Sequence, residues 1–144
     1  MCSSRIGQKK QQNCFENNNE LAQFLSGMKL PIIVNNRGDV MFFTSVDEVE
    51  QELEAVDVER SEYVAYDSEG RLVQLGTALR KQLLFFNVKR VVVQNAEPSP
   101  THAGELQEVL RKFFRHLRVG EPEEWIASAS LDNLVSRGLK KYKH

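Results

Sequence analysis

The pattern that most constrains this fold is a pair of apolar runs joined by a tight turn. The β-branched run Ile32–Val34 is followed by Asn35-Asn36-Arg37-Gly38 and then by a second apolar run, Val40–Phe43. Gly38 can adopt the left-handed backbone conformation that closes such turns. Strands joined by so short a loop pair antiparallel, so this stretch predicts a β-hairpin.

A second hairpin is predicted downstream. Tyr63–Tyr66 has the composition of a strand, residues 67–70 form a turn that ends in glycine, and Leu72–Leu75 returns. A further strand is predicted from Lys89 to Gln94 because of its Val-Val-Val centre. Residues 79–86 are equally compatible with a strand and with the end of a helix, because periodicity does not separate the two in so short a run.

Helices are predicted between and after the hairpins. Ser45 can cap a helix that has Glu48 three residues further on, as in a capping box. The apolar stripe of this helix is Val46, Val49 and Leu53. The strongest helical periodicity spans residues 102–117, with Thr101 as the expected cap.

The C-terminal part is predicted to be helical. Residues 122–126 are compatible with a helical turn, and a last helix is expected from Ser130 to Arg137, ended by Gly138. Hairpins followed by helices predict the α+β class. We expect a mostly antiparallel sheet of about four to six strands built from hairpins, with helices packed on one face and a helical C-terminus.

The chain divides into a tail and one domain. Residues 1–19 are polar and cannot bury enough apolar surface to offset their ordering entropy, so a loose tail is expected there and a single α+β domain over 20–144. A short helix is expected from Asn19 to Ser26. Cys2 and Cys14 are expected to be reduced thiols. Neither a membrane-spanning run nor a secretory signal is recognisable, so we expect a cytoplasmic protein.

Charge is distributed very unevenly along the sequence. From Asp39 to Glu69 there are eleven acidic residues and one base, Arg60. From Arg71 to Arg90 there are five bases and no acid. The formal net charge of −1 conceals both segments. A strong local field on a chain without a catalytic motif favours a binding function.

No residue pattern predicts catalysis. His102, His116 and His144 have no companion ligands at metal-binding spacing. Phosphate-binding loops and nucleophile elbows are absent from the sequence. We therefore expect a protein that is not an enzyme and that requires neither a metal nor another cofactor.

Nucleic acid is not an expected partner. The predicted 102–117 helix and its end carry bases on one side, and further bases lie near the predicted strand ends. The isoelectric point is nevertheless 6.3, and the dense acidic segment would repel a phosphate backbone. We expect these bases to pair with acids inside the chain.

The acidic segment supplies the candidate partner-binding residues. Its carboxylates lie off the apolar stripe and can face either solvent, as a solubilising surface, or a basic partner. Tyr63 and Tyr66 point to opposite faces of one strand, so one is expected in the core and the other as an exposed anchor. The candidate residues are Asp47, Glu48, Glu50, Glu54, Asp57, Tyr63 and Tyr66.

Four stretches between Leu30 and Leu75 resemble the small immunity proteins encoded beside bacterial polymorphic and contact-dependent toxins. They are Pro31–Val34, Gly38–Val40, Ser45–Glu50 and Glu62–Leu72. The resemblance implies a non-enzymatic inhibitor that binds one cognate toxin, and it assigns no fixed functional residues. A basic nuclease is the expected toxin, because an acidic domain can imitate the charge of nucleic acid.

We therefore expect a protein-binding domain with one protein partner and no membrane partner, and specifically an immunity protein that acts through an acidic surface. Two alternatives stay open. A ligand-binding domain or enzyme would have a pocket between the sheet and the long helix, lined by convergent polar groups. A self-associating structural module would expose a sheet edge or an apolar patch.

Overall fold

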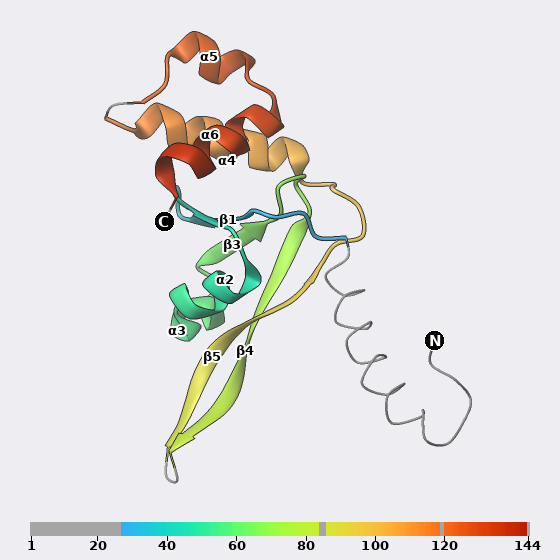
Figure 1. The fold of residues 1–144 in the computed structure, drawn as a ribbon, viewed down its shortest axis with the longest axis vertical. Coiled ribbons are helices and arrows are strands. Elements are labelled where there is room, and N and C mark those ends of the chain that lie inside the picture. Colours follow the sequence, from blue (N-terminus) through green and yellow to red (C-terminus); the bar gives the residue numbers. More distant parts are fainter. Residues whose placement is uncertain (1–26, 84–85, 119, 144) are drawn as a thin grey trace, which may run out of the picture.

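The computed structural model describes residues 27–83, 86–118 and 120–143, with the backbone alone for 80–83 and 86. It confirms the α+β class: a five-stranded antiparallel sheet with helices and a helical C-terminus (Figure 1). The expected tail, the expected helix at 19–26 and both cysteines lie outside the described residues.

Both predicted hairpins are present. The first consists of β1 (Ile32–Asn36) and β2 (Asp39–Phe43), with Gly38 at φ 101° in the turn. The second joins β3 (Tyr63–Tyr66) to β4 (Leu72–Leu83), and Gly70 has φ 95°. The last strand, β5 (Phe86–Ala96), pairs with β4. The sheet order is β2-β1-β3-β4-β5.

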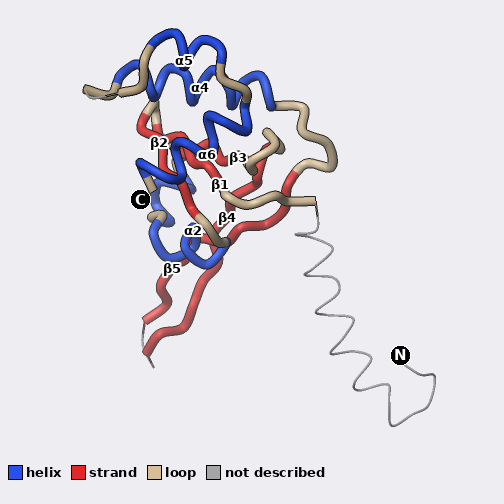
Figure 2. The backbone as a smooth tube through the Cα atoms, turned by 45° about the horizontal axis from the view of Figure 1, so that its top comes forward, coloured by secondary structure: helices blue, strands red, loops and turns tan. Residues whose placement is uncertain are grey.

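Helices cover both faces of this sheet, so the expectation of a single covered face was wrong. The short helices α2 (Val46–Glu52) and α3 (Ala55–Glu59) lie on one face. The helices α4 (Ala103–His116), α5 (Glu123–Ser128) and α6 (Leu131–Tyr142) lie on the other (Figures 1 and 2).

The strand β1 shows why two covered faces are needed. Ile33 faces the α4–α6 side and belongs to a core with Phe42, whereas Ile32 and Val34 face α2 and belong to a second core with Phe43. The three consecutive β1 residues are fully buried. A strand with an uninterrupted apolar run needs cover on both sides.

Helix boundaries differ from expectation at two points. Ser45 caps α2 as predicted, accepting the backbone N–H of Glu48 at 3.1 Å. The cap of α4, however, is His102 and not Thr101, because the Thr101 hydroxyl donates instead to Glu97 at 2.8 Å. The five-residue helix α3 was not predicted.

Gly138 does not end the last helix. It is buried inside α6, which continues to Tyr142. A Cβ atom at this position would lie 2.2 Å from Cζ of Phe42, so the glycine serves close helix–sheet approach. Residues 139–142, beyond the expected helix end, therefore belong to α6, and the Tyr142 ring packs edge-on against Phe113 at a centroid distance of 5.8 Å.

The strands β4 and β5 extend far beyond the rest of the sheet as a two-stranded ribbon (Figure 1). We call the part of this ribbon beyond Leu75 and Val93 the arm. Residues 79–86, for which a strand and a helix end were both compatible with the sequence, lie in this arm. Their described part is strand, and 84–85 lie outside the described residues. None of the described helices is both long and apolar enough to span a membrane.

Candidate protein-binding surface

The acidic helix α2 is attached to the sheet through its predicted apolar stripe. Val49 is fully buried and Leu53 is 6% exposed, both in the core beneath the helix, and Val46 packs at its edge. Because the apolar residues face the sheet, the remaining positions of α2 face outward or toward neighbouring elements.

Three of the five candidate acids have structural contacts. Glu48 accepts the backbone N–H of Thr44 at 2.9 Å and lies 3.4 Å from the Lys143 ammonium group. Glu50 accepts the backbone N–H of Val93 on β5 at 2.8 Å. Asp57 accepts the Tyr63 hydroxyl at 3.1 Å. These carboxylates hold α2 and α3 to the sheet and to the C-terminus.

Electrostatics agree with these contacts. The Thr44 backbone N–H, with the Thr44 hydroxyl and Lys143, lowers the pKa of Glu48. Partial burial, and then the neighbouring Asp57 carboxylate, raise the pKa of Tyr63. Each group is thus held in its ordinary charge state at neutral pH.

The two candidate tyrosines separate as their spacing predicts. Tyr66 is 1% exposed, lies in the core against α4, and donates its hydroxyl to Glu105. Burial and the Glu105 carboxylate both raise its pKa. Tyr63 is half-buried on the opposite face beside α3. Of the pair, Tyr63 therefore has the access that an interface residue requires.

The two remaining candidate acids and one further acid of the same region have no counter-charge. Asp47 and Glu54, which were candidates, and Glu52, which was not, are exposed. Within the described parts of the chain they make no side-chain hydrogen bond and no ion pair. We call Asp47, Glu52 and Glu54 the acidic surface.

Most acids elsewhere are paired with bases. Of the bases that were expected to pair, Lys89, Arg111 and Arg115 do so, whereas Arg90, Lys112 and Arg118 have no ion-pair partner among the described residues. Glu59 lies 2.7 Å from Lys89, Glu62 lies 3.0 Å from Arg37, and Glu123 lies 3.0 Å from Arg115. Glu121 holds both Arg137 and Lys141, at 2.7 and 3.0 Å. Asp39, Glu124 and Asp132 are also exposed without an ion-pair partner among the described residues, but they lie on three separate elements, β2, α5 and α6. Asp47, Glu52 and Glu54 instead lie close together in the chain, on α2 and at its junction with α3.

A polar cluster at the β3–β4 turn was not predicted as a site. Asp67 is completely buried and accepts four N–H groups: the backbone N–H of Lys29, Glu69 and Arg71, and the Arg71 guanidinium at 3.2 Å. Its only signal in the sequence was the Asp-Ser-Glu-Gly turn. Its acceptors are engaged within the chain, so we assign it a structural role.

A second polar group joins β5 to α4. His102 Nδ1 lies 2.7 Å from Glu97 Oε1, and Glu97 also accepts the Leu72 backbone N–H at 2.9 Å. The pKa of His102 is raised by the Glu97 carboxylate. Partial burial alone would raise the pKa of Glu97, but His102, Leu72 and Thr101 together lower it to about 2. Thr101 Oγ1 also lies 3.1 Å from His102 Nδ1, and its hydroxyl donates to Glu97 at 2.8 Å. The three side chains together form a hydrogen-bonded ion pair at the start of α4.

The alternative of a ligand-binding domain called for a pocket between the sheet and the long helix, and an open groove of about 460 Å³ lies in that region. It lies between the β1–β2 turn and the end of α4, and Phe113 and Leu117 form its apolar lining. Arg37 is paired with Glu62, and His116 Nδ1 lies 2.6 Å from the Lys112 carbonyl. Two of its polar groups are thus engaged by the chain itself, and we assign the groove no ligand.

No cluster of potential metal ligands occurs among the described residues. Comparison with known proteins found no matching family, no matching curated protein and no matching solved structure.

Proposed function

We propose that this chain is a non-enzymatic protein-binding domain whose acidic surface binds a basic partner. The observation that carries the proposal is the absence of counter-charges at Asp47, Glu52 and Glu54, in a protein that pairs most of its other acids. Unpaired charges of one sign steer a complementary partner and repel others.

The rigidity of the α2–α3 region supports the same proposal. Glu48, Glu50 and Asp57 fix this region through hydrogen bonds, and Val49 and Leu53 anchor it to the sheet. Binding to a rigid surface costs little ordering entropy. Tyr63, half-buried beside α3, is the apolar neighbour that could contribute to the centre of an interface.

The partner class follows from the resemblance to immunity proteins. We propose a cognate toxin whose active site attracts phosphate and is therefore basic, with the acidic surface occupying that site. Such a partner would associate rapidly at low salt and more slowly as salt screens the charges.

A pull-down with matched variants tests the proposal. The variant Asp47→Lys/Glu52→Lys/Glu54→Lys reverses the acidic surface without touching the apolar stripe. The control Asp39→Lys/Glu124→Lys/Asp132→Lys changes three exposed acids on other elements. It therefore has the same net charge as the surface variant. Host lysate is applied at low and at moderate salt, and bound proteins are identified by mass spectrometry.

We expect one basic protein to be retained by the unaltered chain and by the control, eluted by salt, and lost from the surface variant. The purified partner should then lose its nuclease activity in the presence of the unaltered chain. Equal retention by both variants would refute the acidic surface as the binding site. If the chain retains no basic protein under either condition, the surface acts in solubility.

A further inference from the structure

The outer edge of β4 lacks a neighbouring strand along most of its length. The four-residue strand β3 pairs with β4 only at Ala65–Val73 and Tyr66–Leu72, so most of the twelve residues of β4 have no partner on this side. Before β3, the chain turns away at Ser61, where φ is 57°, toward α3. Beyond Val73, the side of β4 that faces away from β5 has no strand partner in the described chain.

Backbone alternation shows which β4 groups face outward. The Arg71 carbonyl accepts from Asp67 on the β3 side, whereas the Leu72 carbonyl accepts from Glu97 on the β5 side. Consecutive residues of a strand direct their polar groups to opposite sides. The odd-numbered positions Leu75, Thr77 and Leu79 therefore turn their N–H and C=O groups outward.

The bulge in the ribbon does not disturb this alternation. The register passes from Gln74–Asn95 to Leu75–Val93, so the extra residue belongs to β5. Val93, opposite Leu75, directs its N–H outward to Glu50. An outward-facing residue in an antiparallel pair has an outward-facing partner, which independently assigns Leu75 to the open edge.

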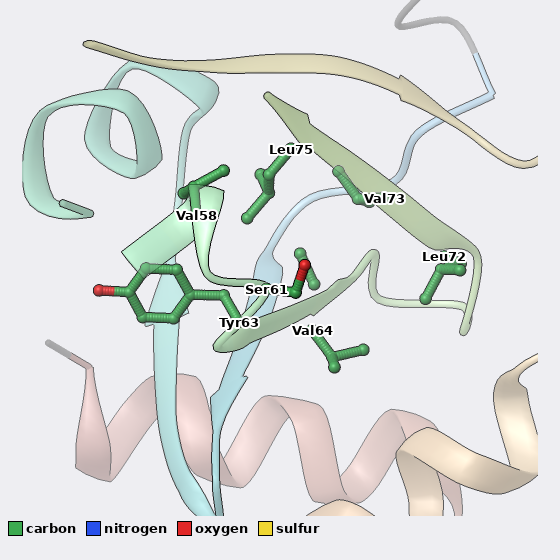
Figure 3. A pocket seen from close by; sticks show the side chains of 8 residues that line it. Val58, Ser61, Tyr63, Val64, Leu72, Val73 and Leu75 are labelled. Carbon is green, nitrogen blue, oxygen red and sulfur yellow. The ribbon is translucent and has the colours of Figure 1, made fainter. Parts of the chain in front are cut away.

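A cleft lies at the point where β3 and β4 diverge. It has a volume of about 250 Å³, and its lining comes from three elements, including Val58 of α3, Val64 of β3 and Leu75 of β4 (Figure 3). Further along the edge, Leu79 is 67% exposed. An open edge flanked by apolar side chains is a template for an additional strand.

The two faces of the arm differ in chemistry. Leu75 and Leu79 point to the α3 side, where Lys89 is already neutralised by Glu59. The opposite face carries Arg90, which is exposed, pairs across the ribbon with Ala78, and has no ion-pair partner in the described parts. The Thr77 hydroxyl, between the two leucines, donates to Glu59 at 3.4 Å on the α3 side. A strand added to this edge would therefore meet Leu75 and Leu79 on one face, with a neutralised ion pair beside them, and the positive charge of Arg90 on the other.

The charge of the ribbon indicates which kind of strand can pair with the open edge of β4. The ribbon from Leu72 to Ala96 contains Arg80, Lys81, Lys89 and Arg90 and no acid. A second copy would bring one basic arm alongside another, and bases on an edge strand are a known device against self-pairing. An acidic strand would instead be attracted.

We propose that the edge of β4 from Leu75 to Leu79 is a strand-addition site for an extended segment of a partner protein, in which acidic residues alternate with apolar ones. The backbone of the segment pairs with Leu75, Thr77 and Leu79. Its apolar side chains lie on the side of the cleft and Leu79, and its acids lie on the side of Arg90. Tyr63 lines the cleft and is shared with the proposed interface, but none of Asp47, Glu52 and Glu54 lines it, so the charge of the acidic surface is not part of this site.

A synthetic probe tests the proposal on the full chain. The probe is a short end-blocked peptide of alternating Glu and Val, labelled for fluorescence anisotropy. Two reference peptides are a Lys-Val alternation and a block peptide with all its Glu residues before its Val residues. We expect saturable binding of the Glu-Val alternation at least about tenfold tighter than either reference. Amide hydrogen exchange should slow at Leu75, Thr77 and Leu79.

Two pairs of variants separate charge from backbone pairing. Arg90→Glu should weaken binding by about fivefold, whereas Lys112→Glu, the same change at an exposed base on α4, should leave it unchanged. Leu79→Pro removes one outward N–H and should abolish binding, whereas Leu79→Ala keeps it and should cost less than about fivefold. Unchanged thermal melting of Leu79→Pro verifies that the arm is still folded.

Several results would overturn the proposal. These are equal affinity for the Lys-Val peptide, protection of amides outside β4, or full binding by a folded Leu79→Pro variant. Concentration-dependent dimerisation that protects the same amides would assign the edge to a second copy. Reversal of the acidic surface should leave peptide binding intact, so this site and the proposed function fail independently.

Discussion

The Glu50 carboxylate accepts the backbone N–H of Val93 at 2.8 Å, across 43 residues of sequence. This contact holds α2 against β5 next to the bulge, where the β5 backbone faces outward. Glu50, whose charge made it a candidate for partner binding, thus links a helix to a sheet edge by a hydrogen bond. The relationship explains why α2 covers the base of the arm.

Removing the Glu50 hydrogen bond should destabilise the domain. Glu50→Ala leaves the Val93 N–H without its acceptor, at an expected cost of about 1–3 kcal/mol in the free energy of unfolding. Glu50→Gln keeps an acceptor and should cost less than about half of that. Urea denaturation followed by circular dichroism measures both, and equal stability of the two variants would show that the bond contributes nothing.

Gly138 should not tolerate a methyl group. Gly138→Ala places a Cβ 2.2 Å from the Phe42 ring, and overpacking of this kind costs about 1–3 kcal/mol even though alanine is the better helix former. Gly104 in α4 is the matched control, because a Cβ there has no neighbour within 4 Å. Gly104→Ala should be neutral or stabilising by up to about 1 kcal/mol. Thermal and urea denaturation that rank the two substitutions the other way would contradict the packing.

Asp67 and Glu69 both contact Arg71 but should differ greatly in importance. Asp67 is completely buried, and Asp67→Ala leaves three backbone N–H groups without their acceptor and removes one of the two carboxylates from a largely buried guanidinium, at about 3–5 kcal/mol. The Glu69 carboxylate is 45% exposed, and Glu69→Ala should cost no more than about 1 kcal/mol. Chemical denaturation of the two variants under identical conditions makes the comparison. Similar losses would mean that the buried cluster is not a stabilising centre.

Stability should depend on the charge state of the Glu97–His102 pair. The pKa of Glu97 is lowered from 4.5 to about 2, so its contribution is present above pH 4.5 and is lost as the pH falls toward 2. The pKa of His102 is raised from 6.5, so its contribution is present below pH 6.5 and is lost as the pH rises through the higher folded-state value.

The pair is therefore fully formed between pH 4.5 and 6.5. The difference in melting temperature between the unaltered chain and His102→Gln should be largest in that window and should shrink toward pH 9. His116→Gln is the control, since His116 is an exposed histidine at the end of α4. A difference that stays constant with pH would exclude the ion pair as its cause.

Short-range features of this protein could be read from its sequence. The two hairpins, the Ser45 cap and the 102–117 helix depend on turn glycines, capping chemistry and apolar periodicity, which involve residues only a few positions apart. In the candidate site, the same reasoning correctly assigned Asp47 and Glu54 to positions off the apolar stripe. It also predicted that the side chains of Tyr63 and Tyr66 would lie on opposite faces of their strand.

Tertiary structure decided the features that depend on distant partners. Glu50 and Gly138 look like a surface acid and a helix stop until β5 and Phe42 are placed against them. The covering of both sheet faces, the open edge of β4 and the isolation of the acidic surface likewise follow from strand order and packing. Local sequence patterns contain no information on which surfaces meet, because contacts between distant residues are selected by burial and charge pairing over the whole fold.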